Sequence, residues 1–205
     1  MCAVSAQVIV LAGPSGSGKS RLAERLRLPV LRLDDFYKLG SDPSLPRITH
    51  GANTGLVDWD HPDSWNQRAA VDAIADLCST GRTDVPVYDI ASSTITGTQT
   101  LALAGRGVFV AEGIFAQNIV GECRRRQLLA AAVCVTQHPG VTFVRRLRRD
   151  LRERRETPLV LVRRGWTLMI AQRPLIEGAR AAGCRVLTTA QAHAELSPLC
   201  DQEAP

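Results

Sequence analysis

The stretch Gly13-Pro14-Ser15-Gly16-Ser17-Gly18-Lys19-Ser20 decides the fold of this 205-residue chain. It fits the pattern Gly-x4-Gly-Lys-[Ser/Thr], which binds the phosphates of a nucleoside triphosphate. Glycines let the backbone wrap a phosphate without Cβ clashes, and backbone N–H groups and the N-terminus of the next helix then point at negative charge. In this pattern Lys19 reaches the β- and γ-phosphates and the Ser20 hydroxyl coordinates Mg²⁺. We therefore expect all eight residues to bind ATP.

The segments around this loop have the pattern of a parallel α/β sheet. The apolar run 8–12 predicts a buried strand before the loop, and residues 20–27 predict a helix after it. This context favours a phosphate-binding loop over an ordinary glycine-rich turn. Further strands are expected at 30–33, 107–111, 131–135 and 186–188, a short extended piece at 85–88, and helices at 62–79, 122–130, 139–155 and 166–182. Strands that alternate with helices predict an α/β fold with a parallel sheet.

Length and composition predict a single cytoplasmic domain that spans residues 1–205. Hydrophobic residues make up 45% and charged residues 22%, which is ordinary for a soluble globular protein. No run approaches the ~20 apolar residues that cross a bilayer, and residues 1–7 lack the basic side chains of a signal peptide, so we expect no membrane partner. The six cysteines include no Cys-x-x-Cys pair and are expected to be buried, inert thiols. The polar tail from about 190 is expected to be loosely held.

Charge is distributed unevenly along the chain, whose formal net charge is +5. Residues 121–185 hold 15 arginines and 5 acidic residues, a local charge of +10, so the remainder carries −5. A basic segment beside an acidic one suits a polyanionic ligand, either nucleic acid or a nucleoside triphosphate. Few aromatic residues and no nucleic-acid motif make nucleic acid the weaker alternative, and we expect no such partner.

Carboxylates follow two of the predicted strands, where ligands of open parallel sheets collect. Glu112 ends the strand 107–111, a place where an acid orients the metal or its water, and a solvent-facing glutamate in a strand-to-helix turn is the less favoured alternative. Asp34 and Asp35 follow the strand 30–33, and a carboxylate there could accept a proton from an attacking hydroxyl. Neighbouring residues of an extended segment point in opposite directions, so only one is expected to face the site. The spacing does not say which one, and a pair of turn aspartates is the alternative.

Asp60-His61-Pro62-Asp63 precedes the predicted helix 62–79 and has two interpretations. Asp60 could be the N-cap of that helix, and Asp63 could complement its dipole. The alternative is that these carboxylates bind a ligand. The local pattern supports both interpretations equally.

The run 145–156 holds seven arginines and three acidic residues. A solvated helix with ion pairs four residues apart, such as Asp150 with Arg154, would explain part of it. Several arginines are left without partners in that interpretation, and Arg146 and Arg149 share a helix face. Phosphoryl transfer needs cations beside the transferred group, which this run could supply.

In these motifs the chain resembles uridine kinases, which belong to the uridine kinase/phosphoribulokinase group of P-loop kinases. The shared motifs, in the order seen in that group, are the loop 13–20, Asp34-Asp35-Phe36-Tyr37-Lys38, Asp60-His61-Pro62-Asp63, Pro86-Val87-Tyr88-Asp89, Glu112-Gly113-Ile114 and the arginine-rich run. The resemblance covers about residues 7–156. It implies a five-stranded parallel sheet flanked by helices, and ATP- and Mg²⁺-dependent phosphorylation of a nucleoside 5′-hydroxyl.

The resemblance also implies roles for individual residues. Asp34 corresponds to the base that accepts the hydroxyl proton, and Glu112 to the glutamate that serves Mg²⁺ together with Ser20. An arginine-rich lid is implied near 145–158. On the acceptor the resemblance places Tyr37 in the pocket, Asp60 on the ribose hydroxyls, Tyr88 on the base and Arg146 from the lid, and on ATP it places Arg149, at the transferred group, and Arg154.

The chain departs from the group where the acceptor base is recognised. Uridine kinases usually continue Tyr-Asp-Phe-x-x-His, and the histidine reads the pyrimidine, whereas this chain has Ile90 and Ser93 at those two positions. Pyrimidine specificity is therefore not expected to follow. The alternatives are a kinase of the same fold for another alcohol, such as a sugar phosphate or vitamin precursor, and an ATP-binding regulatory protein without transferase activity. A homo-oligomer is possible in each case.

Overall fold

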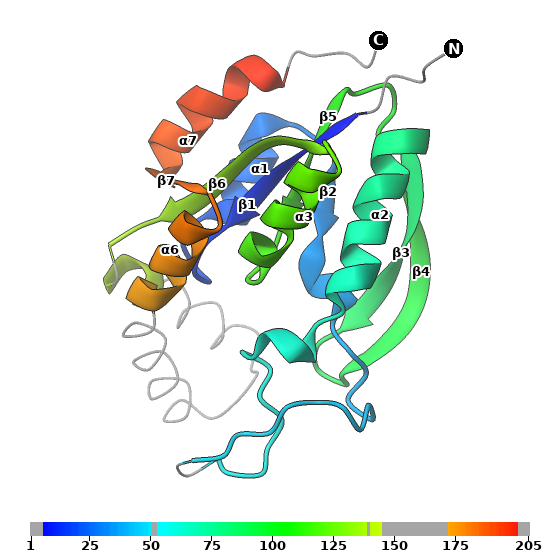
Figure 1. Ribbon diagram of the computed structural model, residues 1–205, viewed down its shortest axis with the longest axis vertical. Coiled ribbons are helices and arrows are strands. Elements are labelled where there is room, and N and C mark those ends of the chain that lie inside the picture. The colour runs from blue at the N-terminus through cyan, green and yellow to red at the C-terminus, as the bar shows by residue number, and fades with distance from the viewer. Residues whose placement is uncertain (1–5, 51–52, 139, 145–171, 201–205) are drawn as a thin grey trace.

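The computed structural model describes residues 6–50, 53–138, 140–144 and 172–200. Their main sheet has five strands, all parallel, in the order β2-β5-β1-β6-β7 (Figure 1). The strands are β1 (Gln7–Ala12), β2 (Val30–Arg32), β5 (Val108–Glu112), β6 (Leu129–Thr136) and β7 (Arg185–Thr188). The predicted α/β fold with a parallel sheet of about five strands is confirmed.

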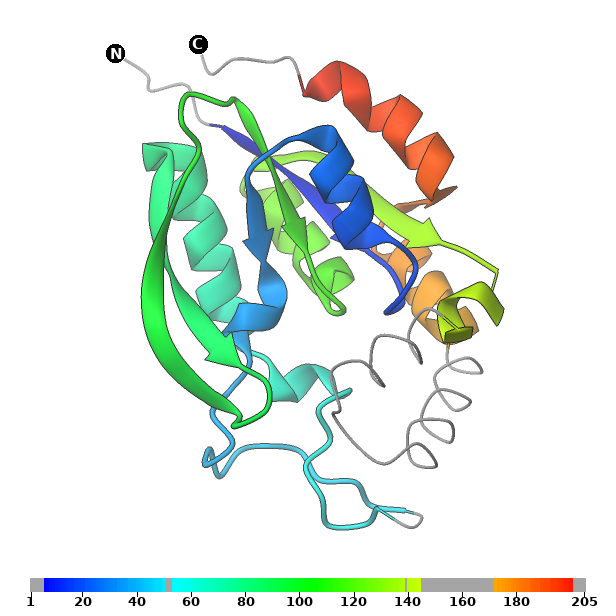
Figure 2. The same cartoon turned by 180° about the vertical axis from the view of Figure 1, so that it is seen from behind.

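Helices cover both faces of this sheet, which is why its central strands are apolar throughout. Figure 1 shows one face, with α2 (Gln67–Thr80), α3 (Val120–Arg125) and α6 (Gln172–Ala181). Figure 2 shows α1 (Lys19–Leu26) on the opposite face, where α7 (Thr189–Leu196) packs beside it. Within the described residues, no helix combines the length and the apolar character needed to span a membrane.

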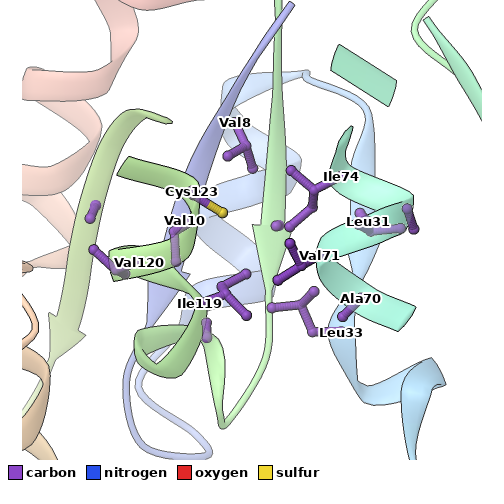
Figure 3. Packing of buried hydrophobic residues seen from close by; sticks show 14 of the residues in the cluster. Val8, Val10, Leu31, Leu33, Ala70, Val71, Ile74, Ile119, Val120 and Cys123 are labelled. Carbon is purple, nitrogen blue, oxygen red and sulfur yellow. The ribbon is translucent and has the colours of Figure 1, made fainter. Parts of the chain in front are cut away.

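The alternation of side chains along β1 divides the core into two layers. Val8 and Val10 belong to the cluster that also holds Ile74 of α2 and Cys123 of α3 (Figure 3). Ile9 and its alternate neighbour Leu11 point the other way, into the cluster that holds Leu22 of α1. The six named residues of β1, α2 and α3 are fully buried, so the strand before the phosphate-binding loop is fixed from both sides.

The helix predicted at 62–79 begins later than expected. Residues Pro62–Ser64 form only a short 3₁₀ turn (η2), and Trp65 is extended before α2 starts. The N-cap is Asn66, whose side chain accepts a hydrogen bond from the Ala69 N–H at 3.1 Å. Asp60 is therefore not the cap. Trp65 interrupts the helix because its buried indole N–H donates to the Leu33 carbonyl at 2.7 Å.

The prediction of a loosely held tail from about 190 is wrong for the described residues up to Cys200. Helix α7 begins with a capping box between Thr188 and Gln191. Its Ala192 and Leu196, four residues apart on one face, are fully buried in the cluster beneath α1. Two apolar residues at helical spacing thus dock a segment whose composition is otherwise polar.

An antiparallel hairpin flanks the main sheet beyond β2. It pairs β3 (Arg82–Asp89) with β4 (Thr94–Ala102), and β3 packs against α2 and against the 3₁₀ turn η1 (Leu33–Phe36) that follows β2 (Figures 1 and 2). Of this hairpin the sequence predicted only the piece 85–88. Strand β4 escaped prediction because it is rich in threonine and exposed along nearly its whole length, so it carries no alternating apolar pattern.

The described cysteines are free thiols, as expected. Cys78, Cys123, Cys134 and Cys184 are buried. Burial raises the pKa of Cys78 to about 12 and that of Cys123 and Cys184 to about 11. Because the thiolate is the reactive form, these side chains are inert core residues at neutral pH.

Candidate active site

The phosphate-binding loop joins β1 to α1 and depends on glycine at its start. Gly13 has φ 135°, and a Cβ there would lie 2.4 Å from the Val135 carbonyl oxygen of β6. Gly16 and Gly18 also adopt positive φ, at 85° and 100°. The Lys19 Nζ donates to the carbonyl oxygens of Gly13, at 2.7 Å, and Pro14, at 3.2 Å. The lysine ammonium therefore lies across the loop, where phosphate is expected.

Ser20 and Glu112 meet beside this loop because β5 is the neighbour of β1 in the sheet. The Ser20 hydroxyl donates to Oε2 of Glu112 at 3.1 Å. Burial raises the pKa of Glu112, the Ser20 hydrogen bond and the Lys19 charge oppose that rise, and the Asp34 charge adds to it. Glu112 therefore does not face open solvent. A hydroxyl and a carboxylate oxygen converge where a cation could bind.

Asp34 and Asp35 lie on the turn η1 and face different sides of it. Asp34 Oδ1 accepts a hydrogen bond from the Ile114 N–H at 3.4 Å, next to Glu112. Asp35 is 6% exposed and lies toward the hairpin, with Oδ2 3.8 Å from Nε of Arg32. The structure thus places Asp34, and not Asp35, on the side of Glu112 and the phosphate-binding loop. The sequence spacing had left the choice between these two aspartates open.

Gly113 makes this approach possible. A Cβ at Gly113 would come within 2.7 Å of the Leu33 Cβ and 3.1 Å of Asp34 Oδ1. Any larger residue would push the turn η1 away from the end of β5. The glycine after Glu112 therefore brings the two carboxylates of adjacent strands together.

An aromatic cluster joins the segments that follow η1 and β5. Tyr37 is at its centre, with ring centroids of Trp59, Tyr88 and Phe115 at 5.8, 5.9 and 6.0 Å. Sequence reasoning named the two tyrosines and missed Trp59 and Phe115. Their positions gave a signal, because Trp59 directly precedes Asp60 and Phe115 directly follows the Glu112-Gly113-Ile114 motif.

Tyr88 reaches this cluster from the hairpin. Its hydroxyl donates to the Lys38 carbonyl at 3.0 Å, and the Gly40 N–H donates to the Ser93 carbonyl at 2.8 Å. Burial raises the pKa of Tyr88, while a hydrogen bond with the Ser93 side chain lowers it. The hairpin tip is thus joined to the segment after η1 through Tyr88 and Ser93.

Asp60 lies at the edge of the cluster and is exposed. Its N–H donates to Oδ1 of Asp58 at 3.1 Å, and the preceding Trp59 carbonyl accepts a hydrogen bond from the Tyr37 hydroxyl at 3.2 Å. The same loop turn holds Asp63, whose N–H donates to Nδ1 of His61. Asp60 is not the N-cap of α2, and it directly follows Trp59 of the aromatic cluster.

The sequence model of the Phosphoribulokinase / Uridine kinase family matches residues 8–160. The chain belongs to this family. It is 28% identical to the uridine kinase of Lactobacillus johnsonii over 155 residues, which cover 72% of this chain and 69% of that protein. It is 29% identical to the uridine kinase of Haemophilus influenzae strain PittGG over 158 residues, which cover 72% and 70%. The chain is accordingly an ATP-dependent P-loop kinase.

A solved structure supports the fold independently of sequence. The crystal structure of a protein named as a fructose transport system kinase, from Silicibacter sp. TM1040, aligns with a TM-score of 0.59. The alignment covers 90% of this chain and 88% of that chain at 17% identity. Likeness at this identity shows the fold alone.

The arginines predicted for the lid lie outside the described residues. These are Arg146, Arg149 and Arg154, together with the whole predicted lid at 145–158. Of the helix predicted at 139–155, the described residues 140–144 are helical. The roles of the three arginines in this kinase stay predictions.

Replacing Glu112 by glutamine should stabilise the ligand-free kinase and lower its activity. The pKa of Glu112 is raised in the folded state, so this carboxyl loses its proton at a lower pH in the unfolded chain than in the folded one. The free energy of unfolding therefore falls as pH rises from the ordinary pKa to the raised one. Glutamine removes that loss and still accepts the Ser20 hydrogen bond. The melting temperature of the variant should match that of the wild type at acidic pH and exceed it at neutral pH.

The exposed Glu24→Gln is the matched control and should shift neither melting temperature nor turnover. A Glu112→Gln variant that is less stable at pH 7.5, or fully active, would show that the buried carboxylate has a different role.

Proposed function

We propose that this kinase transfers the γ-phosphoryl group of ATP to the hydroxyl of an uncharged, ring-bearing alcohol, specifically the 5′-hydroxyl of a nucleoside. One observation supports this most strongly. Asp34 bonds to the N–H of Ile114, which lies in the chain between Glu112, the partner of Ser20, and Phe115, a member of the aromatic cluster, so a carboxylate is close both to the expected phosphate site and to aromatic rings. Family membership supplies the reaction class, and this arrangement suggests the acceptor.

The ATP side would use the loop 13–20. Backbone N–H groups of the loop and the start of α1 would bind the phosphates, and Lys19 would exchange its loop carbonyls for phosphate oxygens. Arg149 and Arg154 would complete the ATP site from the predicted lid. Positioning and charge neutralisation are the main tasks of the protein in such a reaction.

Ser20 and Glu112 fit a magnesium ion. They offer oxygen atoms 3.1 Å apart, which Mg²⁺ prefers. Among the described residues, no group of three or more His, Cys, Asp and Glu side chains could hold a metal by itself. That suits Mg²⁺, which binds through one or two carboxylates and completes its shell with waters and substrate phosphates. When bound, the ion neutralises charge that develops on the phosphates.

Asp34 would act as the general base. The acceptor hydroxyl would give its proton to the Asp34 carboxylate while its oxygen attacks the γ-phosphorus, and the bond to the ADP oxygen breaks. The Ile114 N–H, at 3.4 Å from Oδ1, would keep the carboxylate oriented. Holding the two reactants in line supplies the rest of the acceleration.

The charges on the acceptor side support an acceptor without a phosphate group. Residues 34–66 hold six aspartates against two cations, Lys38 and Arg47. Both cations already have partners, since Lys38 Nζ donates to the Ser44 hydroxyl at 3.0 Å and Arg47 Nη1 to the Gly55 carbonyl at 2.8 Å. In this described part of the acceptor side no cation stands ready for a second phosphate, which disfavours a sugar phosphate.

The aromatic residues on the acceptor side favour an acceptor molecule that contains a flat ring. Both tyrosines of the chain and two of its three tryptophans, Trp59 and Trp65, lie on this side, and Trp65 packs on Phe115 with centroids 5.9 Å apart. Trp65 and Phe115 are buried, whereas Tyr37, Trp59 and Tyr88 are partly exposed. A flat base could stack on these three rings, which is worth ~0.5–1.5 kcal/mol per aromatic pair beyond the area buried. Asp60, exposed at its edge, would take the ribose hydroxyls, and Arg146 would approach from the lid.

Steady-state kinetics on an acceptor panel tests the proposal. The panel holds uridine, cytidine, purine nucleosides, free sugars, sugar phosphates and simple alcohols. We expect kcat/KM to be highest for ribosides, lower for free sugars and lowest for sugar phosphates. A sugar phosphate as the best substrate, or ATP binding without transfer to any acceptor, would contradict the proposal.

Uridine and cytidine should not be selected over other nucleosides. Histidine could read a pyrimidine edge, whereas the Ser93 side chain is shorter and its carbonyl accepts a hydrogen bond from the Gly40 N–H. One such hydrogen bond is worth ~1–3 kcal/mol, so Ser93→His should raise the preference for uridine roughly 5–150-fold. Ala91→His, on the same exposed turn, is the control and should not change the preference. Strong uridine selectivity in the natural chain would show that another residue reads the base.

A further inference from the structure

We propose that Thr189, at the start of α7, is a positioning residue that orients the Ser17–Gly18 peptide so that the Gly18 N–H points at the phosphates of ATP. The inference takes the loop 13–20 as the phosphate site. It goes beyond the proposed function, because it concerns the nucleotide side and holds for any acceptor. Thr189 also lies outside residues 8–160, which the family model matches, so family membership assigns it no role.

The register of the sheet brings Thr189 to the phosphate-binding loop. Strands β6 and β7 are parallel neighbours, and Thr136 pairs with Thr188 at their carboxyl ends. Gln137 and Thr189 are the next residues of the two segments. The loop leaves the carboxyl end of β1, which is the other neighbour of β6. Because the carboxyl ends of parallel strands share one edge of a sheet, the start of α7 lies next to the loop.

Two hydrogen bonds connect this edge of the sheet to the loop. Gln137 Nε2 donates to the Thr189 hydroxyl at 3.1 Å, and the Thr189 hydroxyl donates to the Ser17 carbonyl oxygen at 3.4 Å. The amide nitrogen of Gln137 can only donate, so the Thr189 oxygen accepts there and keeps its single proton for Ser17. The Ser17 carbonyl is therefore held from outside the loop.

Helix α7 gives the Thr189 hydroxyl a fixed place. It begins with a capping box at Thr188, and its Ala192 and Leu196 are fully buried in the cluster that also holds Leu22 of α1. Figure 2 shows α7 on the same face of the sheet as α1, and the two helices are in contact. Thr189 is thus fixed relative to the helix that follows the loop.

A held Ser17 carbonyl also sets the direction of the Gly18 N–H. The two groups belong to one planar trans peptide unit and point in opposite directions, so the Gly18 N–H points away from α7. Among the described residues this N–H donates to no acceptor, and no side chain caps the N-terminus of α1. The N–H is therefore left for a phosphate oxygen, which backbone N–H groups at a helix N-terminus bind.

The loop by itself holds this peptide weakly. Gly18 has φ 100° and no Cβ, so it can change φ at little cost and the peptide can turn over. The Ser17 hydroxyl is fully buried and has no hydrogen-bond partner in the described part of the chain. The Ser17 N–H donates to the Pro14 carbonyl at 3.1 Å, which fixes the preceding peptide. The Thr189 hydroxyl fixes the next one.

Two substitutions separate the hydroxyl of Thr189 from its shape. Thr189→Val removes the hydroxyl and keeps the branched side chain, whereas Thr189→Ser keeps the hydroxyl. By isothermal titration, Thr189→Val should bind Mg-ADP and Mg-pyrophosphate about three- to tenfold more weakly, by the same factor for both, because one hydrogen bond is lost. Thr189→Ser should bind both like the wild type. Thr100→Val is the matched control, because it loses a 2.6 Å bond to Asp84 on the exposed hairpin.

Hydrogen exchange at the Gly18 amide, measured by NMR in the complex saturated with Mg-ADP, tests the orientation itself. Exchange should be slow in the wild type and in Thr189→Ser, and severalfold faster in Thr189→Val, while the amides of β1 keep their rates in all three. A purely structural role of Thr189 would instead speed exchange in β1 as well. Should Thr189→Val fail to fold, Thr189→Ala replaces it with the same expectations.

Several results would overturn the inference. One is unchanged affinity for both ligands, or unchanged Gly18 exchange, in the folded Thr189→Val or Thr189→Ala variant. Another is weaker binding of Mg-ADP with unchanged binding of Mg-pyrophosphate, because Thr189 would then act on the nucleoside part of ATP. A third is a Thr189→Ser variant as impaired as Thr189→Val, which would assign the effect to packing. If the wild type binds Mg-ADP but phosphorylates no alcohol, the proposed function fails while these measurements still decide the role of Thr189.

Discussion

Lys19→Ala should abolish phosphoryl transfer and weaken Mg-ATP binding at least tenfold. The Lys19 Nζ now lies 2.7 Å from the Gly13 carbonyl, at the centre of the phosphate-binding loop. Loss of a charge-assisted hydrogen bond to phosphate costs ~1.5–3 kcal/mol in binding, and more in the transition state, where charge develops on the transferred group. Isothermal titration with Mg-ATP and a product assay measure the two effects.

The only other lysine of the chain provides a control. Lys38 Nζ donates to the Ser44 hydroxyl and is remote from the loop in the sequence. Lys38→Ala removes the same charge and should leave the affinity for Mg-ATP unchanged. Unchanged affinity in Lys19→Ala, or an equal loss in both variants, would contradict the assignment of the phosphate site.

Asp34→Asn should lower turnover by ~10²–10⁴-fold, the usual contribution of a positioned base, while ATP still binds. Asparagine can still accept the hydrogen bond from the Ile114 N–H, so the turn η1 should keep its shape. Loss of kcat with retained nucleotide affinity is therefore the expected signature. Rapid-quench and binding measurements on one preparation separate the two quantities.

Asp35→Asn is the matched control for this change. It makes the same substitution one residue further along the same turn, on the buried side that faces the hairpin. It should retain turnover within a few-fold of the wild type. If Asp35→Asn proves inactive and Asp34→Asn active, the base has been assigned to the wrong residue.

The sequence predicted the parts of the fold that have a strong local pattern. The strand at 8–12 and the loop 13–20 follow from a continuous apolar run and from spaced glycines. Strand β4 and helix α7 lack such patterns, because few of their side chains are buried. Asn66 became the N-cap through Trp65, whose indole contact with Leu33 joins residues 32 positions apart.

Some residues of the candidate site could likewise be located from the sequence, and others could not. Glu112 and the loop could be located from strand ends, since neighbouring strands of a parallel sheet bring these ends together. The choice between Asp34 and Asp35 could not be made, because η1 is a 3₁₀ turn whose direction depends on the close approach of Gly113. The contact of Ser93 with Gly40 also depends on the hairpin turn, where Ser93 has φ 53°. Such tertiary contacts leave no trace in local spacing.

Mass-spectrometric analysis of the kinase with Mg-ATP and a pool of nucleosides, sugars and sugar phosphates tests the central claim most directly. We predict a phosphorylated nucleoside that carries the γ-phosphoryl group of isotopically labelled ATP, and no such product with Asp34→Asn. A phosphorylated sugar phosphate, or label found only in inorganic phosphate, would contradict the claim that this site phosphorylates an uncharged, ring-bearing alcohol.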